Sequence, residues 1–374
     1  MPDLPPRSPA PLRVLHLAGS AVDEFYADVS RLYASDCLGA VADPARYEHH
    51  VAYVSPDGSW RFPGDLSADA IAAAPATTLA DAVDTVAGLD VDVMVPQMFC
   101  RPGMTHYRAL FDLLGVPYLG NRPAVMAVGA DKAQASAVVA RAGVRVPEAQ
   151  VVRPGDALAL DLPVVVKPVD ADNSLGLTLL READGFEAAV AAAVEHDGAG
   201  RALVETYVEL GREVRCGVVD VDGELRCLPL EEYAVDATSK PVRDRDDKLR
   251  RSEDGDLALV AKDAEHAWIL APTDPPDPVT AAVHEAALRC YEALGCRHYG
   301  LFDFRIDPDG TPFFLEAGLY CSYARSSVVV AMAAAAGITL TELFEAGVAC
   351  VLPSVPTASP AAVPTSAPTP APGG

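Results

Sequence analysis

The stretch GLFDFRIDPDGTPFFLEAGLY, residues 300–320, decides the fold, because it predicts a β-hairpin with one acid on each arm. Apolar residues alternate along the first arm, and Asp307-Pro308-Asp309-Gly310 is a turn sequence. Asp303 and Glu316 stand between apolar flanks, where a carboxylate is costly unless a positive group neutralises it. Mg²⁺ would do so, since it binds carboxylates together with phosphate oxygens. The alternative is a pair of solvated acids at the sheet margin, and the hairpin alone leaves both open.

Length and charge limit the class of protein. The chain has 374 residues and half of them are hydrophobic, enough for two or three domains with buried cores. Lys and Arg number 29 against 53 Asp and Glu, a net charge of -24, which argues against nucleic acid or an anionic membrane surface as partner. The N-terminal sequence lacks the blocks of a signal peptide, and no apolar run approaches the roughly 20 residues that span a bilayer. We expect a soluble, cytoplasmic protein.

The cysteines predict a reduced protein. There are eight of them, with no CxxC pair and no zinc-like cluster. We expect buried thiols rather than disulfides or a metal site.

The pattern along the chain predicts α/β and α+β domains. Proline-rich ends, residues 1–11 and 353–374, cannot bury a core and are expected to be disordered. Alternating strands and helices in 12–125 predict a parallel α/β domain, 126–210 an α+β domain, and 211–352 a mainly antiparallel one. The expected strands include 13–17, 50–54, 91–96, 118–119, 162–168, 178–180 and 202–205. The expected helices are 23–38, 79–88, 106–114, 131–142, 185–195, 278–294 and 327–336.

Two lysines and a loop could bind phosphate. Lys167 ends a β-branched strand and precedes Pro168, which fits a phosphate contact, although a strand-end lysine reaching to solvent has the same pattern. Lys132 follows Asp131 at an expected helix start, where a solvated lysine is the alternative. Between the expected strands 162–168 and 178–180, the loop DADNSLG (residues 170–176) offers the Ser174 hydroxyl and backbone N–H groups to an anion.

In this order the motifs resemble the ATP-grasp fold and, within it, the D-alanine:D-alanine ligases, over about residues 12–350. The resemblance implies three domains with ATP bound between the central and C-terminal ones. It implies that Asp303 and Glu316 bridge Mg²⁺ to the phosphates, that a serine loop covers them, and that Glu213 holds the ribose. The residues it assigns to the nucleotide are Lys132, Lys167, Ser174, Glu205, Thr206, Tyr207, Val208, Glu213 and Lys248.

Several positions depart from the D-alanine ligase pattern. The arginine that meets the oxyanion is replaced by Leu301, with Arg305 as the nearest substitute, and the asparagine after the second metal acid is Gly318. The N-terminal signature is also replaced, so that Asp23 or Glu24 would contact the first substrate. The phosphate chemistry is therefore expected to be kept while the substrate pocket differs.

A closer resemblance explains these departures. GSAVDEFYADVSRLYASDCL, PQMFCRPGMTHYRALFDLLGVPYLGN and FLEAGLYCS are similar to the ligases that finish mycosporine-like amino acids. That resemblance implies ATP- and Mg²⁺-dependent joining of mycosporine-glycine to a small amino acid, serine or threonine, through a phosphorylated intermediate, with an imine as product. Arg215, Tyr320 and Ser322 are candidates for substrate contact.

The roles that follow leave some choices open. Arg305, Ser174 and a loop lysine would act in catalysis; that lysine is Lys248 in RDRDDKLRR, with Lys240 as the alternative. Two other functions remain: an amide-forming ligase similar to D-alanine:D-alanine ligase, and an ATP-binding regulatory protein without turnover. The wider family makes a homodimer the expected assembly.

Overall fold

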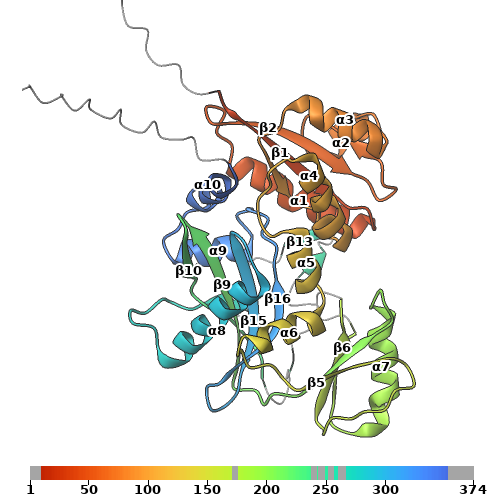
Figure 1. Ribbon diagram of the computed structural model, residues 1–374, viewed down its shortest axis with the longest axis vertical. Coiled ribbons are helices and arrows are strands. Elements are labelled where there is room, and N and C mark those ends of the chain that lie inside the picture. The colour runs from red at the N-terminus through yellow and green to blue at the C-terminus, as the bar shows by residue number, and fades with distance from the viewer. Residues whose placement is uncertain are drawn as a thin grey trace, which may run out of the picture.

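The computed structural model describes residues 10–170, 176–236, 242, 249–251, 257–259 and 267–352. They form three lobes, with the N-terminal lobe at the top of Figure 1, the C-terminal lobe below it and the central lobe at the lower right. Ser174, Lys240 and Lys248 lie outside the described residues, as do the terminal segments 1–9 and 353–374.

The N-terminal lobe is the predicted parallel α/β layer. Its sheet has the order β3-β2-β1-β4, in which β2 and β4 run parallel to β1 and β3 runs antiparallel to β2. The helices α1, α2 and α3 start at polar caps; Asp23 of α1, for example, accepts a hydrogen bond from the Tyr26 N–H at 2.8 Å. The elements are β1 Leu12–Gly19, α1 Glu24–Ala40, β2 Tyr47–Val54, β3 Trp60–Arg61, α2 Ala68–Ala73, α3 Leu79–Leu89, β4 Val93–Pro96, a π-helical turn Gly103–Tyr107 and α4 Arg108–Leu114.

The central lobe is a four-stranded antiparallel sheet covered by one helix. The strand order is β5-β8-β6-β7, and apolar residues of the sheet and of α7 form a core of their own. Two helices, α5 Pro123–Gly129 and α6 Lys132–Arg141, precede this lobe. Its elements are β5 Ala149–Val152, β6 Val164–Pro168, β7 Thr178–Leu180, a 3-10 turn Ala183–Gly185, α7 Phe186–Glu195 and β8 Ala202–Thr206.

The C-terminal lobe is built on a mainly antiparallel sheet of order β14-β11-β9-β15-β16, with β10 paired to β9. The predicted hairpin is its edge: β15 pairs with β16 so that Asp303 lies directly opposite Glu316. A bulge follows Asp303. The elements are β9 Arg212–Val221, β10 Glu224–Cys227, β11 Glu231–Tyr233, β12 Leu249–Arg251, β13 Leu257–Leu259, β14 Ala267–Ile269, α8 Pro278–Leu294, β15 Tyr299–Ile306, β16 Pro312–Gly318, α9 Val328–Ala335 and α10 Leu340–Val351.

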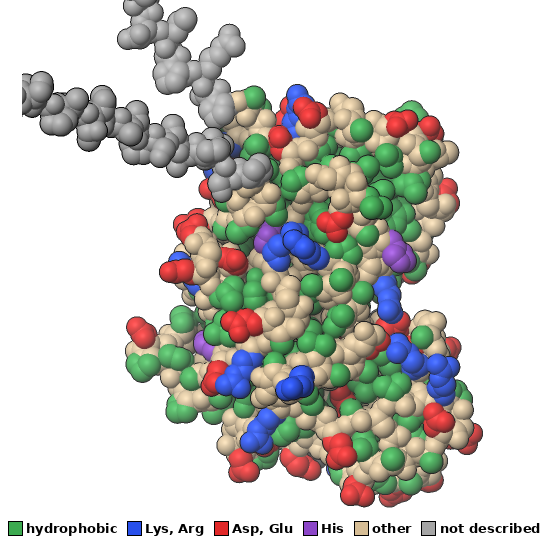
Figure 2. Space-filling view, in the orientation of Figure 1, with side chains coloured by type: hydrophobic (Ala, Val, Ile, Leu, Met, Phe, Trp, Pro, Cys, Tyr) green, Lys and Arg blue, Asp and Glu red, His purple; other side chains and the backbone are tan. Residues whose placement is uncertain are grey.

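The outer lobes share one core, whereas the central lobe does not join it. Val14 and Val95 of the N-terminal sheet belong to the same buried cluster as Tyr323, Val329 and Phe344 of the C-terminal lobe. The central lobe instead buries its own cluster around α7. Figure 2 shows a hollow in the outline where the central lobe meets the rest of the molecule. A continuous core makes the two outer lobes one body, against which the central lobe forms a cleft.

The predicted α/β and α+β class is confirmed, but some short elements were not predicted. We did not predict α5, β5 or α10; the expected chain closed at the helix that is α9. A capping box starts α10, because Thr339 and Glu342 exchange side-chain and backbone hydrogen bonds. Gly337, at φ +78, separates α9 from α10 and allows the sharp turn. The helix α5, with seven residues, and the strand β5, with four, are too short for their periodicity to be read from sequence.

All eight cysteines are free; five of them are buried, and Cys227 and Cys296 are partly buried against one of the larger cores. No single described helix is long and apolar enough to cross a membrane; α9 and α10 pass that test only as a pair, and they bend by 111°.

Two buried histidines predict acid sensitivity. Burial, with His49 nearby, lowers the pKa of His16 to about 3, and burial, with Arg297 and Arg108 nearby, lowers that of His298 to about 3. His298 Nδ1 accepts a hydrogen bond from the Gly120 N–H at 2.9 Å, which requires an unprotonated ring nitrogen. As the pH falls through about 6.5, the unfolded chain binds protons that the folded chain refuses. Below this pH, each buried histidine lowers the free energy of unfolding by about 1.4 kcal/mol per pH unit.

We therefore expect the free energy of unfolding to fall between pH 7 and pH 5 by about 2 kcal/mol per buried histidine. Denaturant unfolding across this range measures it. His298→Asn removes one such group at a left-handed backbone position that asparagine tolerates. The slope of its free energy of unfolding against pH should therefore be smaller by the contribution of one proton, about 1.4 kcal/mol per pH unit. Equal slopes for wild type and His298→Asn would contradict the assignment.

Candidate functional site

A row of charged residues crosses the C-terminal sheet. The strand register places Glu231 of β11 opposite Arg215 of β9, Arg215 opposite Asp303 of β15, and Asp303 opposite Glu316 of β16. Directly opposed residues share a face of the sheet, so these four side chains, here called the charged row, lie side by side. The other face carries Phe302 and Phe304, which pack in the core under α8. Alternation along β15 thus separates the chemistry from the core.

The first lysine sits at the end of the charged row. Lys132 is the first residue of α6, behind its N-cap Asp131, and it is buried. Its Nζ lies 3.6 Å from Glu316 Oε2. Asp131 holds the helix start by accepting from the Gln134 N–H at 2.9 Å and from Arg201 at 3.1 Å. Burial raises the pKa of Asp131, but these hydrogen bonds outweigh it and the net pKa is lowered.

The second lysine is held across the central sheet. Lys167 of β6 and Glu205 of β8 lie on the same face, because Lys167 opposes Leu203 and Val165 opposes Glu205. Lys167 Nζ is 2.6 Å from Glu205 Oε2, and both residues are buried. Burial of the side chain and its pairing with Glu205 argue against the alternative in which Lys167 extends from the strand end into solvent. The other oxygen of Glu205, Oε1, is buried with no hydrogen-bond partner among the described residues.

Arg305 joins the two lobes at the hinge. It follows Asp303 by two residues on β15 and donates to Glu213 Oε2 through Nη2 at 2.7 Å. It also donates to the backbone carbonyl of Val208 at 3.3 Å and lies over the Tyr207 ring, 5.1 Å from its centroid. The structure thus pairs Arg305, a catalytic candidate from the sequence, with Glu213.

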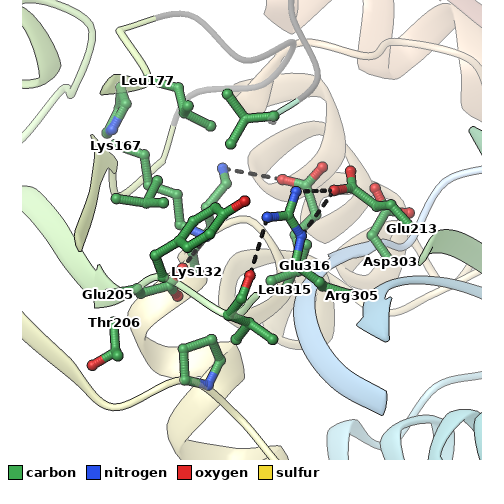
Figure 3. Close-up of a pocket in the computed structure, with 16 residues that line it drawn as sticks. Lys132, Lys167, Leu177, Glu205, Thr206, Glu213, Asp303, Arg305, Leu315 and Glu316 are labelled. Atoms are coloured by element: carbon green, nitrogen blue, oxygen red, sulfur yellow. Dashed lines mark hydrogen bonds and ion pairs between the residues drawn. The ribbon is translucent and has the colours of Figure 1, made fainter. Parts of the chain in front are cut away.

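These residues line one cleft between the central and C-terminal lobes. Its volume is about 740 Å³. Figure 3 shows the side chains that line it. Dashed lines in the figure join Lys132 to Glu316 and Arg305 to Glu213. Its walls also include apolar residues of both lobes, Val165, Leu177 and Leu315 among them. The lining residues predicted for a nucleotide and its metal are Lys132, Lys167, Glu205, Thr206, Tyr207, Val208, Glu213, Asp303 and Glu316. We call this space the main cleft.

The main cleft fits a nucleotide. Apolar walls suit a base, and two buried lysines suit phosphates. The unpartnered Oε1 of Glu205 suits a hydrogen-bond donor such as an exocyclic amino group, because a buried acceptor without a donor costs stability. The two lysines and Glu205 were predicted from the sequence, whereas the apolar wall residues Val165, Leu177 and Leu315 were not.

Asp303 and Glu316 also fit a magnesium ion that is shared with phosphate. They are opposed on neighbouring strands and line the same cleft. Within the part of the chain that the structure describes, no group of three or more His, Cys, Asp or Glu residues could hold a metal by itself. Mg²⁺ commonly binds one or two carboxylates and completes its shell with phosphate oxygens and water. Two acids are therefore sufficient when a nucleotide is bound.

Gly318 leaves room for a further metal ligand. The three atoms nearest to a Cβ built there belong to Leu301, at 3.8–3.9 Å, and Gly318 has no positive φ. We expect Gly318→Asn to fold and to tighten divalent-ion binding about threefold to tenfold, because its carboxamide oxygen would lie on the face of Glu316. Titration with Mn²⁺, followed by electron paramagnetic resonance, measures this. Gly64→Asn, in open space, is the matched control and should not change binding; unchanged binding in Gly318→Asn would contradict the expectation.

A second cavity adjoins the main cleft. Its volume is about 600 Å³, and it shares Lys132 and Glu316 with the main cleft. Three aromatic residues line it, and the rings of Phe99 and Tyr320 lie 5.6 Å apart. Arg101, at its edge, forms an ion pair with Asp170. The aromatic lining residues are Tyr26, Phe99 and Tyr320.

The structure separates the predicted substrate residues. Tyr320 lines the second cavity. Asp23 and Glu24 line neither space; Asp23 caps α1, and Tyr26 of the same helix lines the second cavity instead. Ser322 is buried and accepts from the Ala324 N–H, which makes it part of a turn.

Arg215 contacts Asp303, one of the two acids that fit a magnesium ion. Its Nε and Nη2 donate to the two oxygens of Asp303 at 2.5 and 3.0 Å. Burial opposes its charge, yet attraction to Asp303 raises the pKa of Arg215 well above its ordinary value. From the sequence, Arg215 is a candidate for substrate contact. No sequence motif predicts the ion pair between Arg215 and Asp303, because the two residues are 88 positions apart and only the sheet register brings them together.

The chain is similar in sequence to D-alanine–D-alanine ligases. Residues 156–348 match the family model described as the D-ala D-ala ligase C-terminus. D-alanine–D-alanine ligase A of Mesorhizobium japonicum is 31% identical over 349 residues, covering 85% of this chain and 91% of that protein.

Solved structures share the fold. The VanG D-Ala:D-Ser ligase of Enterococcus faecalis superposes with a TM-score of 0.67 at 19% identity, covering 91% of this chain and 99% of that one. The D-alanine–D-alanine ligase of Bacillus anthracis, in complex with ATP, gives 0.65 at 18% identity, covering 90% and 96%.

Proposed function

The chain belongs to the D-alanine–D-alanine ligase family of ATP-grasp enzymes, and from that premise we propose how its site works and what it joins. It is an ATP-dependent, ADP-forming ligase that uses ATP and Mg²⁺ and acts on small molecules. The observation that carries the proposal is the main cleft, in which two buried lysines and two opposed carboxylates meet. The same observation argues against a regulatory protein without turnover, because such a protein has no need to keep all four groups.

The residues of the main cleft have separate tasks. Lys132 and Lys167 place positive charge where the phosphates bind, and Glu205 with the hinge residues 206–208 receives the base. Glu213, held by Arg305, receives the ribose. Asp303 and Glu316 would hold Mg²⁺, which supplies charge neutralisation at the transferred phosphoryl group. Ser174 and Lys248, or Lys240 in its place, complete the proposal from outside the described residues.

The reaction joins an acid to an amine in two steps. An acidic oxygen of the first substrate takes the γ-phosphoryl group and ADP is formed. The amine nitrogen of the second substrate then attacks the activated carbon, phosphate leaves with the acid's oxygen, and the amine gives up a proton. Because the second cavity meets the main cleft at Lys132 and Glu316, a substrate there can present its oxygen to the phosphate end.

The first candidate for the product is an amide between two small amino acids. The matched proteins are named as ligases of D-alanine with D-alanine or D-serine. Identity to the Mesorhizobium japonicum ligase runs over most of both chains, which favours the same type of bond.

The second candidate is the imine product, formed from mycosporine-glycine and serine or threonine. Two observations favour it. Leu301 and Gly318 stand where the resemblance to D-alanine ligases implies an arginine and an asparagine. The second cavity is lined by the rings of Tyr26, Phe99 and Tyr320, which suit a flat, conjugated ring better than two alanines. The ketone of mycosporine-glycine is a vinylogous acid, so its oxygen can be phosphorylated as a carboxylate is.

One set of incubations separates the candidates. The enzyme is given ATP and Mg²⁺ with either D-alanine and D-serine or mycosporine-glycine and serine, and phosphate release and ultraviolet absorbance are recorded. Phosphate release with the amino acids alone supports the amide. Phosphate release together with a red-shifted absorbance in the second mixture supports the imine. ATP turnover with neither, tested across further acids and amines, would revive the regulatory reading.

A cytoplasmic location and a homodimer complete the proposal. The eight free thiols are compatible with a reducing compartment. The dimer rests on the family resemblance, and sedimentation of the purified protein tests it.

A further inference from the structure

Arg215 has two acidic partners in the charged row, one on each side. It makes a two-pronged pair with Asp303, and its Nη1 also lies 3.7 Å from Glu231 Oε2. The side chains of Asp303 and Glu231 are each 3% exposed, and that of Arg215 is 15% exposed. A guanidinium between two buried carboxylates is stabilised by either of them.

The second partner is itself fixed in place. The Tyr233 hydroxyl donates to Glu231 Oε2 at 2.8 Å, and the Arg215 guanidinium lies 5.6 Å from the Tyr233 ring centroid. β11 therefore provides both an acid and an aromatic face for the same arginine. These contacts with Glu231 and Tyr233 keep the Arg215 guanidinium ordered even when Asp303 binds another group.

The position that lacks an arginine lies next to this one. Leu301 shares its face with Asp303, and its cross-strand neighbours are Gly217 and Gly318. Leu301 packs in the core that joins the outer lobes, so it offers no charge to the site. Arg305 cannot replace that charge while it is paired with Glu213 and the Val208 carbonyl. Arg215 is the guanidinium that the described structure places on Asp303.

We propose that Arg215 is the guanidinium of the phosphoryl-transfer site: it holds Asp303 in the free enzyme, and pairs with Glu231 once Asp303 binds the metal. Its remaining N–H groups then donate to anionic oxygens of the transferred phosphoryl group. This inference rests on the proposed function. A dication and a guanidinium compete for the same carboxylate, and Glu231 lets Arg215 remain buried and neutralised after the exchange.

The proposal predicts two effects of removing Arg215. In Arg215→Met the metal loses its competitor, so Mn²⁺ binding without nucleotide, followed by electron paramagnetic resonance, should tighten about tenfold. At saturating ATP and metal, kcat should fall about a hundredfold or more with KM for ATP within about threefold, because the lost contacts serve the transition state. Arg215→Lys should recover part of kcat, since it keeps the charge without the fork.

Arg212→Met is the matched control. Arg212 lies on the same strand and makes the same two-pronged pair with a glutamate of β11, Glu232, at 2.7 and 3.0 Å, but it does not contact Asp303. Neither metal binding nor kcat should change by more than about twofold. Glu231→Gln should act in the opposite direction from Arg215→Met: it confines Arg215 to Asp303 and weakens Mn²⁺ binding about threefold.

The outcomes separate this inference from the function on which it rests. Unchanged kcat in Arg215→Met at saturating metal, or metal binding that does not tighten, would overturn it. If Arg215→Met does not fold, Glu231→Gln decides by whether Mn²⁺ binding weakens, and Arg215→Lys by whether kcat falls below that of the wild type. If the wild-type enzyme turned over no acid and amine, the proposed function would fail, whereas the Mn²⁺ titrations need no reaction and would still test the competition.

Discussion

Asp303→Asn is expected to lower kcat about a thousandfold, or about 4 kcal/mol in the activation free energy. Asparagine keeps the shape of the side chain but removes the charge that would bind Mg²⁺ opposite Glu316. Arg215 keeps Glu231 as an ion-pair partner at 3.7 Å, so its buried charge stays neutralised and the variant should fold. ADP formation at saturating substrates and 1–10 mM Mg²⁺ measures the loss, and circular dichroism checks the fold.

Asp309→Asn is the matched control, because Asp309 is exposed in the turn of the same hairpin. We expect it to retain wild-type kcat. A folded Asp303→Asn enzyme within tenfold of wild type would show that the opposed carboxylates are not the metal site.

Lys167→Met should reduce kcat/KM for ATP about a hundredfold, or about 2.7 kcal/mol. Its ammonium is buried beside Glu205, and the resemblance assigns it to the nucleotide phosphates. Removing it deletes a positive charge from the main cleft and leaves the carboxylate of Glu205 without its counterion. Steady-state kinetics with varied ATP measure the effect, and nucleotide binding by calorimetry gives the ground-state part.

A second variant separates loss of a charge from loss of fold. Lys167→Met combined with Glu205→Gln removes both charges, so it should be more stable than the single variant yet equally poor with ATP. Arg153→Met, which removes an exposed cation from the same lobe, should not change ATP kinetics. Recovery of ATP affinity in the double variant would place the role of Lys167 in stability instead of nucleotide binding.

Sequence reasoning found the parts of the site that depend on local pattern. Alternation about Phe302 and Phe304 predicted the hairpin with one acid on each arm, whereas the bulge that brings Asp303 opposite Glu316 was not predicted. The strand end at Lys167 and the helix start at Lys132 were also readable, because both elements have short-range signals. All four residues line the main cleft, as the chain order of the motifs implied.

Sequence reasoning failed where contacts depend on sheet register. Arg215 meets Asp303, and Arg305 meets Glu213, across strands whose pairing is not fixed by nearby residues. From the sequence, Arg305 seemed the nearest substitute for the arginine missing at Leu301, since it follows Asp303 by two positions. It lies on the same face, but one row further along, at the hinge. The second cavity is likewise assembled from segments far apart in the chain, such as α1 and the loop after β16.

Transfer of an isotope from the acid to phosphate tests the central claim most directly. The acid substrate is labelled with ¹⁸O at its reacting oxygen, the wild-type enzyme is supplied with ATP, Mg²⁺ and the amine, and the released phosphate is examined by ³¹P nuclear magnetic resonance. If the enzyme phosphorylates that oxygen before the amine attacks, each phosphate carries one ¹⁸O, whether the product is an amide or an imine. Phosphate without the label, released at the same rate as product, would contradict a ligase that works through a phosphorylated acid.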